Sequence, residues 1–137
     1  MIENRLRQLH LIRICLLLPI PLYCFLAIRA PQHTPPTPAF YNMILILAVV
    51  EGGVAVFLRS KLSKMADELW QKSPESKAAL SRWFSSNIVP WALCLSVALY
   101  GLVMRYAGSS LREVSPFFAA GFVLMLCFPP RRPVEMR

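Results

Sequence analysis

Four runs of apolar residues alternate with polar or proline-rich segments along the chain. The runs cover about residues 12–28, 41–58, 87–104 and 114–130. Each approaches the roughly 20 residues that a helix needs to cross the hydrocarbon core of a bilayer. The pattern predicts an all-α, polytopic membrane protein, in which residues 1–137 form a single domain of four transmembrane helices paired in two hairpins.

The connection between the second and third runs, residues 59–86, is the only long polar segment. Apolar side chains recur in it near helical spacing, which indicates two short helices, one with Leu62, Met65 and Leu69 and one with Leu80, Trp83 and Phe84. Ser73-Pro74 is a typical N-cap and first-turn pair, as is Ser115-Pro116 at the start of the fourth span. We expect the first short helix to continue the second span. The lysines of this connection fit an anionic lipid surface, and its tryptophans fit an interfacial belt.

Prolines predict irregular backbone at two places. Pro19 and Pro21 lack backbone N–H groups, so they should kink the first span and leave the carbonyls of Cys15 and Leu17 without their usual helical partners. Four further prolines lie in the connection at residues 30–39, which favours an extended spacer on the opposite side of the membrane.

The basic residues divide unevenly between the two ends predicted for the helices. The chain has 15 lysines and arginines against seven acids, a formal net charge of +8. Twelve basic residues flank the spans on the side of the termini, against three on the other side, Arg29, Arg105 and Arg112. By the positive-inside rule both termini are predicted to be cytoplasmic. Because the charge follows this topology, it predicts no nucleic-acid partner.

The sequence offers no recognisable metal or catalytic centre. All four cysteines fall within predicted spans, and His10 and His33 are expected at opposite membrane faces. Serine hydrolase, zinc protease, nucleotide-binding and dinucleotide-binding motifs are not found. We therefore predict no metal, no cofactor and no enzymatic activity.

Glu51 is the acid that stands out, because it lies inside the second apolar run. Seven or eight residues separate it from the basic end at Arg59, so it should lie roughly 10 Å inside the boundary. We expect a protonated Glu51 to donate a hydrogen bond to the Leu17 carbonyl or a water beside it, with Ser96 as the next candidate. The alternative is an acid that faces a small aqueous notch at Gly52-Gly53.

Small residues predict close helix packing in the second and third spans. Ala48 and Gly52 are four residues apart, and Gly53 widens the gap that they leave. The third span carries Ala92, Ser96 and Tyr100 at intervals of four residues, a small-then-aromatic face. We expect both faces to pack against other helices.

The stretch Val97-Ala98-Leu99-Tyr100-Gly101-Leu102-Val103 resembles the helix motif of rotary-ATPase proteolipid subunits. In that family an ion-carrying carboxylate precedes a similar stretch. This chain has Leu95 at the position where the resemblance implies the carboxylate, so the resemblance transfers no ion-carrying role to the third span. The whole chain looks similar to small four-helix bacterial membrane proteins.

These observations predict a non-enzymatic integral membrane subunit or scaffold of a larger assembly in a bacterial inner membrane. Its partners would be the lipid bilayer and either further copies of itself or other membrane subunits. The alternative is a proton- or ion-translocating component that uses the carboxylate of Glu51.

Overall fold

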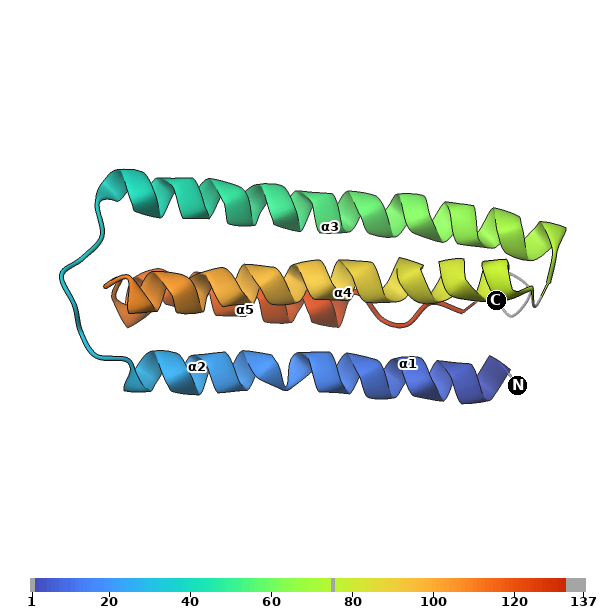
Figure 1. Ribbon diagram of the computed structural model, residues 1–137, viewed down its shortest axis with the longest axis horizontal. Coiled ribbons are helices and arrows are strands. Elements are labelled where there is room, and N and C mark those ends of the chain that lie inside the picture. The colour runs from blue at the N-terminus through green and yellow to red at the C-terminus, as the bar shows by residue number, and fades with distance from the viewer. Residues whose placement is uncertain (1, 75, 133–137) are drawn as a thin grey trace.

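The computed structural model describes residues 2–74 and 76–132, and in these residues it contains helices and no strands. The chain is therefore all-helical, as the apolar runs predict. The helices are α1 (Ile2–Leu17), α2 (Pro19–Arg29), α3 (Pro38–Lys72), α4 (Lys77–Tyr106) and α5 (Leu111–Cys127) (Figure 1).

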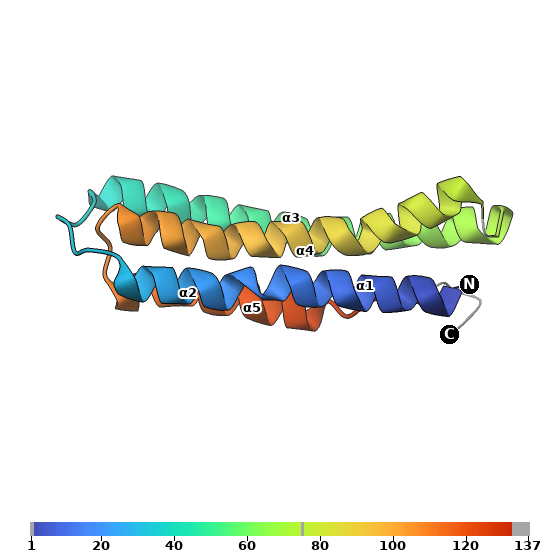
Figure 2. The ribbon, with the colours of Figure 1, turned by 60° about the horizontal axis from the view of Figure 1, so that its bottom comes forward.

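The helices form an elongated bundle around α4. α1 and α2 follow one another as a nearly straight rod, and α3 lies on the opposite side of the bundle from this rod (Figures 1 and 2). α4 packs against each of the other four helices, and α5 packs on α4 and α2. α1 and α3 are thus held apart by the helices between them.

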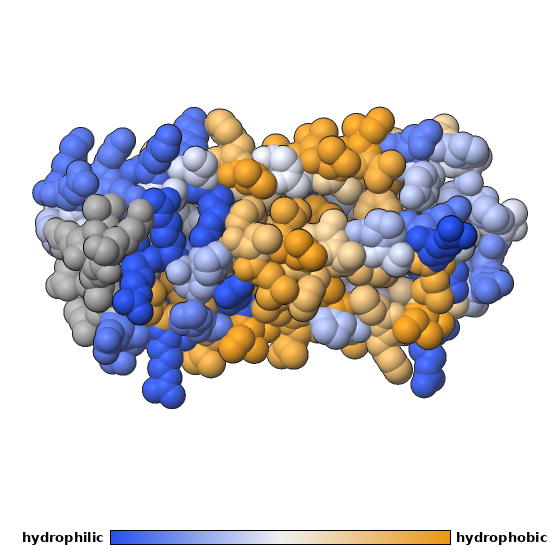
Figure 3. All heavy atoms as spheres, turned by 180° about the vertical axis from the view of Figure 1, so that it is seen from behind, coloured by the Kyte–Doolittle hydropathy of each residue, from blue (hydrophilic) through white to orange (hydrophobic). Residues whose placement is uncertain are grey.

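Three helical segments are long and apolar enough to cross a membrane, namely Glu3–Arg29, Pro38–Lys72 and Lys77–Tyr106. α5 has 17 residues and lies beside them. Large apolar side chains such as Ile28, Val49 and Phe57 are more than 60% exposed. Figure 3 shows an apolar band between two hydrophilic ends. This surface fits a multi-pass membrane protein, in which lipid would cover the band.

The helix over the first apolar run is interrupted where the prolines predict. α1 ends at Leu17, and α2 begins at Pro19 after a turn residue, Leu18. The Leu18 N–H still donates to the Ile14 carbonyl at 3.1 Å, so the helical path continues through the break. The prolines therefore produce a local interruption that hardly changes the direction of the rod.

The polar connection at residues 59–86 does not form separate surface helices. α3 continues from the second span to Lys72, as predicted, but α4 runs from Lys77 directly into the third span. The predicted start at Ser73-Pro74 is wrong, because Ser73 is the C-cap of α3. Ser76 is the N-cap of α4, and its hydroxyl accepts from the Ala79 N–H at 3.1 Å.

The predicted start of the fourth span at Ser115-Pro116 is also wrong. Ser110 and Glu113 form a capping box, in which the Glu113 carboxylate accepts from the Ser110 N–H at 2.9 Å, and α5 begins one turn earlier. Pro116 therefore lies inside the helix. The Ser115 hydroxyl donates at 3.1 Å to the Arg112 carbonyl, the group to which Pro116 cannot donate.

The turn between α4 and α5 depends on Gly108. This residue has a φ of +109°, and a Cβ added to it would lie 2.1 Å from the Thr34 carbonyl oxygen. The proline-rich spacer thus packs directly on the turn. Only glycine combines this backbone conformation with so close an approach.

Candidate functional site

Glu51 lies near the middle of α3 and is partly exposed. Its neighbour on α4 is Tyr100, whose hydroxyl lies near enough to the Glu51 carboxyl for the two groups to interact. Both residues stand at the outer edge of the contact between the two helices, since Tyr100 is also only partly buried. The bundle therefore presents this acid and its phenol partner near its surface.

The structure does not bring Leu17 or Ser96, the residues expected as partners, to Glu51. Leu17 ends α1, on the far side of the bundle from α3 (Figure 1), which separates its carbonyl from the acid. The Ser96 hydroxyl donates to the Ala92 carbonyl of its own helix at 3.2 Å. Sequence reasoning missed Tyr100 as the partner, although it placed this residue on the same stripe of α4 as Ser96.

The predicted small-residue faces are only partly used within the chain. Ala48 is buried, and a Cβ on Gly52 would lie 3.6 Å from a Leu124 side-chain atom. In contrast, Gly53 and Ala92 are exposed, and a Cβ on Gly53 would meet nothing within 4 Å. These two positions therefore do not pack against another helix of this chain.

α4 and α5 approach each other closely at two glycines, Gly101 and Gly121. A Cβ added to Gly121 would lie 2.8 Å from the Cys94 carbonyl oxygen and 2.9 Å from the Ala98 Cβ. A Cβ on Gly101 would lie 2.8 Å from the Phe117 Cβ. An added Cβ would thus meet closer neighbours at Gly101 and Gly121 than at Gly52 and Gly53, so the glycines of α4 and α5 allow the closer helix packing.

A second polar region holds the residues that follow α5, which we call the C-terminal strap (residues 128–132). Trp91 Nε1 donates to the Phe128 carbonyl at 2.7 Å, and Trp83 Nε1 donates to the Arg131 carbonyl at 2.7 Å. Between them, Asn87 Oδ1 accepts from the Arg131 N–H at 3.0 Å. The three α4 side chains are spaced four residues apart, so one face of α4 binds the strap backbone along its length.

The tryptophans of this region are buried in protein and do not form a lipid-facing belt. Trp70 and Trp83 are 2% and 4% exposed, and Trp91 is fully buried. Trp70 and Trp83 also pack together, with ring centroids 6.4 Å apart. The interfacial belt expected for the tryptophans of the connection is therefore wrong. Trp70 and Trp83 pack the last turns of α3 against the first turns of α4.

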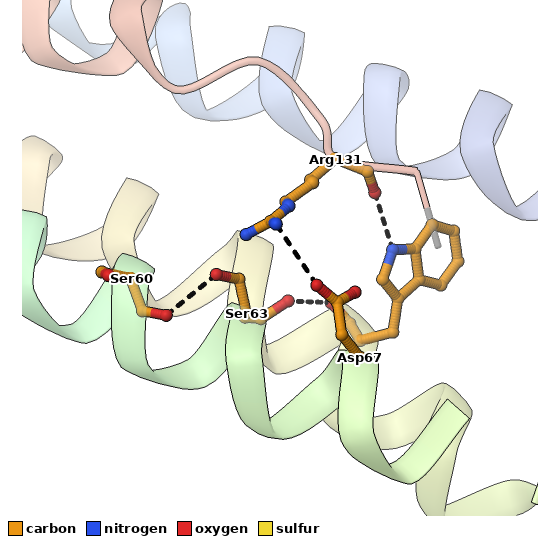
Figure 4. A network of polar contacts seen from close by, with 6 residues as sticks. Ser60, Ser63, Asp67 and Arg131 are labelled. Carbon is orange, nitrogen blue, oxygen red and sulfur yellow. Dashed lines mark hydrogen bonds and ion pairs between the residues drawn. The ribbon is translucent and has the colours of Figure 1, made fainter. Parts of the chain in front are cut away.

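Three arginines surround the same end of α5, and we call Arg13, Arg59 and Arg131 the arginine cluster. Arg13 Nη2 donates to the carbonyls of Met125 and Leu126 at 3.2 and 3.0 Å, and so caps the last turn of α5. Arg59 Nη2 donates to the Pro129 carbonyl. Arg131 Nη2 pairs with Asp67 at 3.2 Å (Figure 4).

Arg105 also donates hydrogen bonds to backbone carbonyls, at the other end of the bundle. Its side chain is 5% exposed and donates from Nε to the Ala27 carbonyl at 2.9 Å. It also reaches the carbonyls of Ser109 at 2.9 Å and Ala30 at 3.3 Å. One guanidinium thus joins the last turn of α2 to the turn after α4, where the helix dipole is negative.

Substitution of Asn87 tests whether the C-terminal strap contributes to the stability of the bundle. Asn87→Leu removes the acceptor of the Arg131 N–H and the amide that donates to the Trp83 carbonyl at 2.9 Å. We expect a loss of about 1–3 kcal/mol in the free energy of unfolding, because buried polar groups lose their partners. Equilibrium unfolding in mixed micelles, monitored by circular dichroism, measures this loss in free energy. Ser85→Leu is the matched control, and an equal loss in both variants would contradict this role.

Comparison with known proteins supplies no further assignment, since no family model, curated protein or solved structure matches this chain. The resemblance of residues 97–103 to proteolipid subunits stays a prediction. In the described part of the chain, no group of three His, Cys, Asp or Glu side chains is placed to hold a metal ion.

Proposed function

We propose that this protein is a non-enzymatic integral membrane subunit or scaffold of a larger assembly in a bacterial inner membrane. The observation that carries the proposal is the position of Glu51 and Tyr100 at the outer edge of the α3–α4 contact, inside the apolar band. A carboxyl group that faces lipid costs roughly 2–3 kcal/mol or more, and a neighbouring protein surface lowers that cost. The bundle thus offers a polar anchor to a partner helix.

The small residues beside this acid support the same conclusion. Gly53 on α3 and Ala92 on α4 are exposed and make no close contact within the bundle. Small residues on a lipid-facing surface let another backbone approach closely. Two of the buried polar side chains, by contrast, are engaged with the backbone of the chain itself, namely Arg105 and Asn87. Their arrangement stabilises a scaffold.

The alternative proposal is proton or ion translocation through Glu51, which its interaction with the Tyr100 hydroxyl favours. A pathway would require further polar groups between this pair and both ends of the bundle. The strap contacts at one end of the bundle and the Arg105 contacts at the other do not include Glu51. Glu51→Gln should therefore abolish proton uptake in vesicles if the alternative holds.

Native mass spectrometry in mild detergents tests the proposed function. We expect an oligomer or a complex with another membrane subunit, which Glu51→Leu weakens by about tenfold or more, equal to about 1.4 kcal/mol. Leu22→Ala, an exposed change on α2, is the control and should leave the complex intact. A strictly monomeric wild-type chain in every detergent would contradict the proposal.

The proposed topology places both termini and the α3–α4 turn in the cytoplasm. On a background without the four native cysteines, we expect Gln71→Cys to react with an impermeant maleimide only after the membrane is opened. Thr34→Cys should react in intact cells, because the spacer that carries it is predicted to face outwards. Both side chains are exposed in the bundle, so accessibility within the protein does not bias the result. The reverse labelling pattern would overturn this topology.

A further inference from the structure

The arginine cluster gathers more positive charge than its surroundings neutralise. Arg13 comes from α1, Arg59 from α3 and Arg131 from the C-terminal strap, and the charges of Arg13 and Arg131 both act on Arg59. Asp67 pairs with Arg131 at 3.2 Å. Among residues 2–74 and 76–132, the three arginines and this one acid leave a formal excess of two positive charges at the end of α5.

Backbone carbonyls satisfy only part of these guanidinium groups. Arg13 Nη2 and Arg59 Nη2 each bind carbonyls of the last turn of α5 or the strap. Arg13 Nε and Arg59 Nη1 are buried and have no hydrogen-bond partner in the described part of the chain. Arg59 also lies over the Phe128 ring, 5.0 Å from its centroid. Under-compensated charge in a partly desolvated place is costly unless an anion accompanies it.

The cluster is accessible from one side. The Arg131 side chain is 35% exposed, and Arg13 and Arg59 are partly exposed. The hydrogen bonds from Arg13 to Leu126 and from Arg59 to Pro129 also lie at the surface. An anion can therefore reach the exposed edges of the guanidinium groups without opening the bundle.

The depth of the cluster indicates which anion it meets. Arg13 and Arg59 flank the inner ends of the first two apolar runs, and Arg131 follows the fourth. All three thus lie where the hydrocarbon core gives way to lipid headgroups. Planar guanidinium groups match the oxygens of a phosphate, and basic pockets between transmembrane helices on the cytoplasmic side bind anionic headgroups.

We propose that the arginine cluster binds the phosphate group of an anionic phospholipid from the cytoplasmic leaflet. The phosphate oxygens accept from Arg59 and Arg131, while Arg13 continues to cap α5. The bound lipid then joins α1, α3 and the strap at one end of the bundle. This site is separate from Glu51 and does not depend on the proposed assembly.

Titration of the full-length, delipidated protein in mild detergent tests this site, with tryptophan fluorescence and thermal unfolding as readouts. The probes are short-chain phosphatidylglycerol, short-chain phosphatidylcholine and inorganic phosphate. We expect phosphatidylglycerol to bind at least about tenfold more tightly than phosphatidylcholine. If inorganic phosphate binds as tightly as phosphatidylglycerol, the site takes free phosphate and the lipid assignment is wrong. Equal binding of the two lipids would also overturn it.

Two variants of Arg59 distinguish a loss of lipid binding from a failure of the protein to fold. Arg59→Gln should weaken phosphatidylglycerol binding by about tenfold or more, and Arg59→Lys, which keeps the charge but loses the planar fork, should fall between. Arg82→Gln is the matched control, because it removes an exposed cation at the same end of the bundle. If Arg59→Gln does not fold, Arg59→Lys decides the question. Binding unchanged in the Arg59 variants, or equally weakened in Arg82→Gln, would contradict the proposal.

Discussion

Arg105→Met is expected to lower the free energy of unfolding by about 3–5 kcal/mol, because three buried carbonyls lose their hydrogen bonds to a charged donor. The variant keeps much of the side-chain volume but leaves the carbonyls of Ala27, Ala30 and Ser109 without their donor. Each carbonyl belongs to a residue that is at most 6% exposed, so water cannot replace the guanidinium. The contact between α2 and the α4–α5 turn should loosen.

Two further variants show which property of Arg105 matters. Arg105→Lys keeps the charge but changes the geometry of the donors, and Arg112→Met removes an exposed arginine from the same region. Lysine keeps the charge but cannot reach three divergent carbonyls with one ammonium group, so we expect an intermediate loss. Arg112 is exposed in the same outer region, and its loss should change stability by less than about 0.5 kcal/mol. Equilibrium unfolding in mixed detergent micelles measures all three variants. If Arg105→Met lowered the free energy of unfolding by no more than Arg112→Met does, the structural role of Arg105 would be disproved.

Gly121→Ala is expected to cost about 1–3 kcal/mol even though it adds a single methyl group. The added Cβ would lie 2.8 Å from the Cys94 carbonyl oxygen and 3.1 Å from the Ala98 nitrogen. Both are backbone atoms of α4, and neither can rotate away as a side chain could. α4 and α5 must therefore separate, which weakens the central contact of the bundle.

Gly53→Ala is the matched control for Gly121→Ala. Both positions lie in helices within the apolar band, but a Cβ on Gly53 meets nothing within 4 Å. Alanine is also the better helix former, by up to about 1 kcal/mol. We expect Gly53→Ala to be neutral or stabilising in the same unfolding assay. Equal destabilisation at the two positions would show that helix packing does not explain the effect.

The helices could be predicted from the sequence because apolar length and proline chemistry act locally. Pro19 marks the interruption of the first span, and the continuation of α3 follows from its periodic apolar residues. The serine-proline pairs predict the wrong starts for α4 and α5, because the N-caps of these helices, Ser76 and Ser110, are not followed by proline. The spacing Ser110–Glu113 was the available signal for the start of α5.

The polar contacts could not be predicted, because their acceptors are backbone carbonyls. Any residue carries such a group, so nothing in the sequence links Arg13 to Met125 or Trp91 to Phe128. The uneven distribution of the basic residues predicts a membrane orientation, but it does not predict which carbonyls the arginines bind. The spacing of Trp83, Asn87 and Trp91 on one face of α4 was a usable sign, but their partners depend on how the strap folds back.

The measurement that tests the proposed function most directly is site-specific photo-crosslinking in the native membrane, followed by affinity purification. A photoreactive residue at Ala92 would report on the exposed face beside Ser96 and Tyr100, and one at Phe25 would report on the exposed face of α2. We predict a protein adduct from Ala92, either a second copy of the chain or another membrane subunit, and lipid adducts alone from Phe25. Lipid adducts alone from both positions would contradict the assignment of this protein as a subunit or scaffold.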